Sequence, residues 1–169
     1  MTRKMLLTSA LVFSFAAYGA DLATENLNAP AGFSRLKTLV GKWQADTQTG
    51  KARVTYELVS GGSVLVGHEK EENMPEMMTV YYLDGNRLLL THYCMLGNQP
   101  RMQAQPFDAA SGELKFEFLD ATNLKSPGEG HMHDVKIRFT DENHIVTEWQ
   151  FYENGQPKMT ETAQFTRIR

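Results

Sequence analysis

Three histidines on predicted strands are the residues whose chemistry is most distinctive. His92 lies within residues 91–102, and His131 and His133 belong to the run His-Met-His-Asp. Successive side chains of a strand point to opposite faces, so residues two apart share a face. An imidazole can hydrogen-bond to an organic ligand, bind a metal ion or move a proton. These three histidines are therefore candidate site residues.

The strand pattern predicts which polar side chains accompany them. Counting the alternation backwards from Val135 places His131 and His133 on the inner face, and counting forwards from Phe116 places Asp120 there too. Residues 91–102 run from a strand end through a Gly-Asn turn, so their polar groups are expected at the same rim. The predicted ligand-binding set is His92, Tyr93, Asn98, Arg101, Asp120, His131 and His133.

Several kinds of site remain open on these residues. The histidines fit hydrogen-bonded rim or core residues, or groups that orient an organic ligand whose acidic part Arg101 attracts. A metal site of His92, His131 and His133, or a haem with one axial histidine, is an alternative. A further alternative is a small-molecule enzyme with a histidine general base, or with Cys94 as nucleophile beside His92.

The elements that position these residues read as consecutive strands. Apolar and polar residues alternate with period two, as in Val135, Ile137 and Phe139, and turn residues such as Asn154-Gly155 separate the runs. About ten such runs follow one short helical pattern at residues 33–40. The predicted fold is all-β, an up-and-down antiparallel β-barrel with a short N-terminal helix, and a two-sheet sandwich is the rival.

Three residues point to closure of the barrel and to a family. Trp43 follows Gly41 in a Gly-x-Trp strand after the helix, and Arg167 shares the phase of Phe165 in the last strand, where it can lie over the indole. This layout resembles the calycin superfamily, which includes lipocalins, fatty-acid-binding proteins and nitrobindins. The resemblance implies a barrel that holds a small, partly apolar molecule. Residues 47–50 leave no room for the helical lid of fatty-acid-binding proteins.

The N-terminus reads as an export signal. Arg3 and Lys4 precede an apolar run that is too short to cross a bilayer, and Ala17-Tyr18-Gly19 fits a cleavage site. The sequence thus predicts a secretory signal peptide at residues 1–19, a flexible segment at 20–32 and a lipocalin-like barrel domain at 33–169. Residues 91–102 also resemble a group of uncharacterised exported bacterial proteins. We expect a periplasmic or secreted protein with no membrane span.

The composition limits the classes of partner that this protein is expected to bind. The formal charge of -3, from 17 basic and 20 acidic residues, argues against nucleic acid as a partner. The single cysteine, Cys94, excludes an intramolecular disulfide. The run Glu69-Lys70-Glu71-Glu72 reads as a solvated strand end, and the numerous methionines read as core filling or as the lining of a cavity. A small, lipophilic ligand is the expected partner, and the sequence leaves open whether a cofactor is bound.

Overall fold

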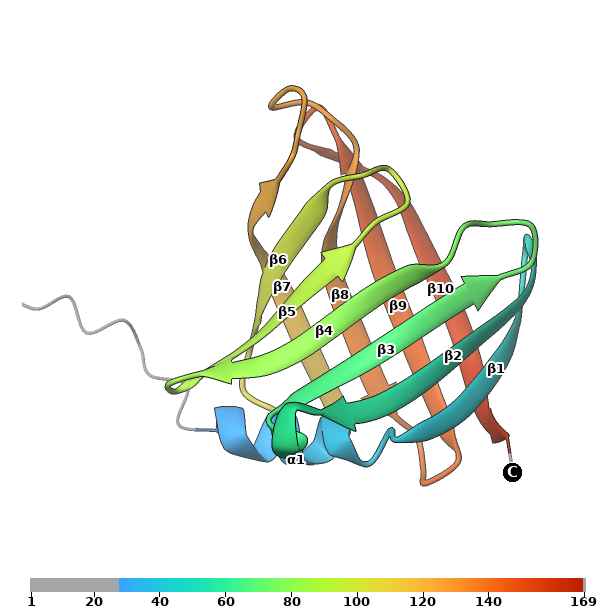
Figure 1. The fold of residues 1–169 in the computed structure, drawn as a ribbon, viewed down its shortest axis with the longest axis vertical. Coiled ribbons are helices and arrows are strands. Elements are labelled where there is room, and N and C mark those ends of the chain that lie inside the picture. Colours follow the sequence, from blue (N-terminus) through green and yellow to red (C-terminus); the bar gives the residue numbers. More distant parts are fainter. Residues whose placement is uncertain (1–27, 169) are drawn as a thin grey trace, which may run out of the picture.

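Ten strands and one helix account for the described part of the chain in this computed structural model, residues 28–168 (Figure 1). The helix α1 spans Ala29–Lys37, and a single 3-10 turn, η1, spans Ser60–Gly62. The strands are β1 (Gly41–Thr47), β2 (Gly50–Val59), β3 (Val64–Glu71), β4 (Met77–Asp84), β5 (Arg87–Tyr93), β6 (Gln99–Ala104), β7 (Glu113–Thr122), β8 (His131–Phe139), β9 (His144–Glu153) and β10 (Gln156–Ile168).

The strands form a closed barrel. Each strand pairs antiparallel with the next, and β1 also pairs with β10, where Trp43 lies opposite Arg167. Closure leaves the sheet without free edges, which is the physical advantage of this topology. The predicted all-β up-and-down barrel is confirmed, and the sandwich alternative is excluded.

Alternation along the strands separates the core from the surface. In β2, Ala52, Val54 and Tyr56 are buried, whereas Arg53 and Thr55 between them are exposed. The two-residue turn before β10 contains Asn154 and Gly155, which both adopt positive φ, at 53° and 68°. Such turns match the right-handed twist of the strands, so local sequence and sheet geometry agree.

Helix α1 closes one end of the barrel (Figure 1). Pro30 occupies its first turn, where a missing N–H costs nothing, and the apolar side chains of Phe33 and Leu36 are buried against the barrel. The helix begins at Ala29, so the last residues of the segment expected to be flexible belong to it. The signal peptide predicted for residues 1–19 lies outside the described residues.

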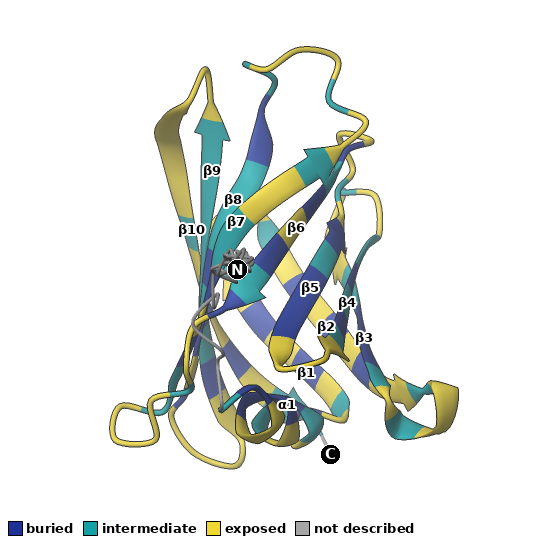
Figure 2. Ribbon diagram, turned by 90° about the vertical axis from the view of Figure 1, so that its left-hand side faces the viewer, coloured by how far each residue is buried: buried dark blue, intermediate teal, exposed yellow. Residues whose placement is uncertain are grey.

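The core fills the half of the barrel next to α1. Buried residues are concentrated there, whereas the far ends of β9 and β10 are intermediate or exposed (Figure 2). The other end, formed by the β1–β2, β3–β4, β5–β6, β7–β8 and β9–β10 connections, carries no helix (Figure 1). Within residues 28–168, no helix has the length and apolar character needed to span a bilayer.

Candidate functional site

The open end of the barrel contains a cavity of about 420 Å³, here called the outer cavity. This volume lies within the range of roughly 300–1,000 Å³ that small-molecule sites occupy. Its apolar wall consists of Met74, Met77, Met95, Leu96, Met132, Phe151 and Met159. Its polar lining consists of Thr47, Gln48, Thr49, Glu71, Cys94, Thr160, Glu161 and Thr162. Methionine is flexible and polarisable, so this wall can adapt to irregular apolar shapes.

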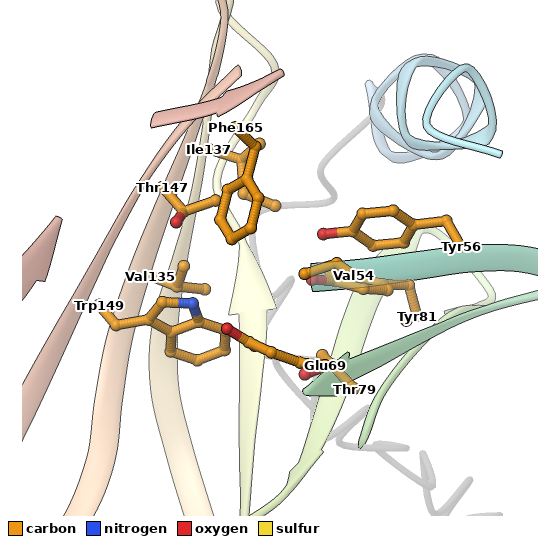
Figure 3. A pocket seen from close by; sticks show the side chains of 11 residues that line it. Val54, Tyr56, Glu69, Thr79, Tyr81, Val135, Ile137, Thr147, Trp149 and Phe165 are labelled. Atoms are coloured by element: carbon orange, nitrogen blue, oxygen red, sulfur yellow. The ribbon is translucent and has the colours of Figure 1, made fainter. Parts of the chain in front are cut away.

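A second, inner cavity lies in the middle of the barrel and measures about 20 Å³. That is room for about one water molecule. Tyr56, Tyr81 and Trp149 fill most of this level, and the Glu69 side chain extends from β3 across the interior toward Trp149 (Figure 3). Gly67 makes the packing possible, because a Cβ there would lie 2.8 Å from the ring of Tyr56. The interior of the barrel is therefore nearly solid below the outer cavity.

A buried carboxylate sits in the wall of the outer cavity. Glu71 is only 7% exposed, and its Oε1 accepts hydrogen bonds from the hydroxyls of Thr47 and Thr49 in the β1–β2 hairpin. Thr47 and Thr49 also line the cavity. The hairpin thus fixes this carboxylate at the rim without a cation.

Two further carboxyls face the same interior. Burial, together with the charges of Glu161 and Glu71, raises the pKa of Glu69 to about 7. Burial and the charge of Glu71 likewise raise the pKa of Glu161. None of the three acids forms an ion pair with a basic side chain within the described residues. The open half of the barrel interior therefore carries acidic side chains that no basic side chain of the described residues neutralises.

His92 is the one predicted histidine whose neighbours are inner-cavity residues. It is 2% exposed, its Nδ1 lies 2.9 Å from the Thr79 hydroxyl, and its ring lies 4.9 Å from that of Trp149. Thr79 and Trp149 line the inner cavity. Burial lowers the pKa of His92 to about 4, so the ring is neutral at neutral pH. Its Nε2 is buried without a hydrogen-bond partner.

His131 and His133 lie in a stack of rings that does not include His92. The His133 ring lies between Phe118 and Tyr152, at centroid distances of 4.5 and 3.9 Å, and the His131 ring lies 4.9 Å from Phe118. The Nδ1 of His131 bonds to the carbonyl oxygen of Glu129 at 2.8 Å, and its Nε2 is buried without a partner. Neither histidine lines either cavity.

A β-bulge explains why the extrapolated alternation misplaces this pair. The pairing of β8 with β9 shifts between Met132 and Asp134, so His133 is an extra residue and the inward phase passes to Met132. Asp134 keeps its pairing with Gln150 of β9, and beyond the last β7–β8 pair its Oδ1 accepts a hydrogen bond from the backbone N–H of Phe118 at 3.0 Å. His133 Nδ1 lies 3.1 Å from the same oxygen but is not aligned for a hydrogen bond.

A second bulge carries Asp120 to the outer surface. The pairing of β6 with β7 shifts between Arg101 and Met102, and Met102 is buried in the core while Arg101 faces out. Arg101 and Asp120 form a bidentate ion pair, with Nε 2.6 Å from Oδ1. Hydrogen bonds from Arg101 lower the pKa of Asp120, so both groups are charged and satisfied by one another. Neither is placed to receive a ligand in the cavities.

The other predicted residues have distinct surroundings. Tyr93 is exposed at the end of β5. Asn98 is fully buried, and its Nδ2 donates a hydrogen bond to the carbonyl oxygen of Gly130 at 2.9 Å. Asn98 therefore ties the β5–β6 turn to the start of β8.

Cys94 reaches the outer cavity, but burial raises the pKa of its thiol, which is the reverse of what activates a nucleophile. Across residues 28–168, no three side chains of the types His, Cys, Asp and Glu are grouped so that they could share a metal ion. The three histidines of the metal alternative thus have no common centre in this structure.

The acids of the cavity were not among the predicted site residues. The run at residues 69–72 suggested a solvated strand end, yet Glu69 and Glu71 point inward while Lys70 and Glu72 are exposed. The signal was present in the alternation. Val54 and Ala52 pair with these two glutamates, so their shared apolar phase predicts the inward face.

Comparisons with known proteins identify the fold only. No family model matches the sequence, and no curated protein matches it. Among solved structures, the chain is similar to a protein of unknown function from the DUF3598 family of Nostoc punctiforme, with a TM-score of 0.55 and 10% identity over 79% of this chain. This chain spans about half the length of that protein, as the match covers 49% of it.

Proposed function

We propose that this protein is an exported, calycin-like barrel that binds a small, partly apolar molecule in the outer cavity. The observation that carries the proposal is the 420 Å³ cavity at the end without a helix, walled by methionines and Phe151. Burial of apolar ligand surface against such a wall supplies affinity, at about 25 cal/mol per Å². Export rests on the signal-like pattern of residues 1–19 and on nothing else.

Competing functions draw less support from the described residues. A general base works best with a pKa near the working pH, whereas the pKa of His92 is lowered to about 4. Asp120 could assist a histidine general base only from the interior, and it is held instead by Arg101 on the outer surface. A binding protein therefore remains the best reading of the geometry.

Uptake of a neutral lipophilic dye tests the proposal. Nile red should bind the purified protein at micromolar concentration with a blue-shifted emission. The variant Met132→Trp, which fills the cavity from β8, should weaken binding by about tenfold or more.

The matched control is Met78→Trp, because Met78 lies on β4 next to Met77 but does not line the cavity. Native mass spectrometry of protein purified from its own host provides a second readout, in which a bound small molecule is expected. Absence of any bound molecule, together with no dye uptake, would refute the proposed function.

A further inference from the structure

The outer cavity combines an apolar wall with negative charge and no positive charge. Glu71 and Glu161 line it, and Glu69 lies at the next level of the interior, on the wall of the inner cavity. None of the residues that line the two cavities is Lys, Arg or His. Fatty acids carry a carboxylate that such a site would repel.

The three acids are arranged from two sides of the barrel. Glu69 and Glu71 are two residues apart on β3 and share its inner face, and Glu161 lies on the inner face of β10, where it pairs with Trp149. The electrostatic influence of Glu161 and Glu71 on Glu69 shows that these carboxyls act on one another across the interior. A positive group placed between them would lower the free energy of all three charges.

The level below the outer cavity has no room for a head group. The inner cavity measures about 20 Å³, and His92, whose buried Nε2 has no hydrogen-bond partner, lines neither cavity. A charged group of the ligand would therefore meet Glu71 and Glu161 in the outer cavity, with Glu69 at the level below.

From this arrangement we infer that the ligand is a cationic amphiphile: an apolar body against the methionine wall, and a protonated amine directed to Glu71, Glu161 and Glu69. The inference rests on the proposed function and adds the charge class of the ligand. Glu71 is preformed for this role because its hairpin hydroxyls hold the carboxylate in place before any ligand arrives.

Three amphiphiles with the same alkyl chain separate charge from hydrophobicity: decylamine, decanol and decanoate. Each is used below its micellar concentration to displace Nile red from the full-length purified protein at neutral pH. Decylamine should compete at a concentration about tenfold lower than decanol, a difference of roughly 1.4 kcal/mol, and decanoate should be the weakest.

The variant Glu161→Gln tests the acids directly. It should weaken decylamine binding several-fold more than decanol binding, so that decanol reports how far the cavity itself is altered. The control Glu153→Gln removes the same charge from an exposed position at the end of β9, on the same end of the barrel, and should change neither affinity.

The outcomes distinguish this inference from the proposed function. Equal affinities for the three amphiphiles, tightest binding of decanoate, or equal loss of decylamine and decanol in Glu161→Gln would overturn the cationic class while leaving a lipophile-binding barrel. Failure of Nile red and of all three amphiphiles to bind would overturn the proposed function itself.

Discussion

The guanidinium carbon of Arg167 lies 4.2 Å from the centre of the Trp43 ring, and this contact joins the last strand of the barrel to the first. The same guanidinium donates hydrogen bonds to the carbonyl oxygens of Thr38, Val40 and Glu142, at 2.7, 2.7 and 3.1 Å. Thr38 caps the C-terminus of α1, whose carbonyls have no partner within the helix. Arg167 therefore fixes both the seam of the barrel and the helix that closes it.

Loss of this guanidinium should destabilise the protein strongly. We expect Arg167→Ala to lower the free energy of unfolding by about 2–4 kcal/mol, because three carbonyls lose a charged donor and the indole loses its cation. Arg167→Lys should recover part of the lost free energy of unfolding, since an ammonium keeps the charge but cannot donate hydrogen bonds to the three carbonyls in the same geometry. Urea unfolding measures both. Arg138→Ala, at an exposed position in β8, is the control and should stay within about 0.5 kcal/mol of wild type.

The contact between Trp43 and Arg167 also shows what the sequence could reveal. Uninterrupted alternation gave Arg167 the phase of Phe165, from which it could lie over the indole, and the structure has its guanidinium there. Alternation misplaced His133 and Asp120, because His133 is the extra residue of one β-bulge and Asp120 lies just beyond another. Neither extra residue is a Gly or Pro that would mark the bulge in the sequence. An extra residue reverses the phase of everything beyond it, so a rim extrapolated from core strands is the least secure part of a barrel prediction.

The outer cavity could not be predicted from the sequence, for a different reason. Periodicity tells which side chains face inward but not whether they fill the space between them. The methionines suggested either core filling or a lined cavity, and the structure shows both uses: Met102 is fully buried in the core, while Met74, Met77, Met95, Met132 and Met159 line the outer cavity. Only the three-dimensional packing distinguishes these roles.

Gly67 should be irreplaceable unless Tyr56 changes with it. In Gly67→Ala the added methyl would approach the Tyr56 ring to 2.8 Å, and we expect a loss of about 1–3 kcal/mol in the free energy of unfolding. Adding Tyr56→Leu should make the effect of the alanine much smaller, since the clashing ring atoms are gone. Additive losses in the double variant would show that the cost of the alanine does not come from the Tyr56 ring.

The ion pair of Arg101 and Asp120 should matter little, in spite of its bidentate geometry. Both side chains are about half exposed, at 45% and 48%, so solvent and salt screen their attraction. Arg101→Ala should change the free energy of unfolding by about 1 kcal/mol or less and leave Nile red binding unaffected. A large loss of dye affinity in this variant would show that Arg101 contributes to the site after all.

Glu69 should make the protein less stable as the pH rises from acidic to neutral. Its pKa is raised from 4.5 to about 7, so between these values the folded state binds more protons than the unfolded chain and stability falls with rising pH. Part of the group contacts solvent, so we expect a change of at most about 2–3 kcal/mol. Glu69→Gln should remove this contribution, so the variant should gain stability relative to wild type as the pH rises through this window, and unfolding in urea at a series of pH values measures the difference. The control Glu153→Gln should show the same pH dependence of the free energy of unfolding as wild type.

His92 should produce the opposite dependence in nearly the same pH window. Its pKa is lowered from 6.5 to about 4, so the folded ring stays neutral while the unfolded chain takes up a proton, and stability is lost as the pH falls from 6.5 toward 4. In the wild type this trend offsets that of Glu69, and the pH profile of unfolding should be shallow. His92→Gln keeps a polar group near Thr79 but cannot titrate in this window. Only the contribution of Glu69 should then remain, so the stability of the variant relative to wild type should increase as the pH falls. If instead His92→Gln tracks the wild type at every pH, the ring must reach solvent and ionise freely in the folded protein, which would require the packing of Trp149 over it to open.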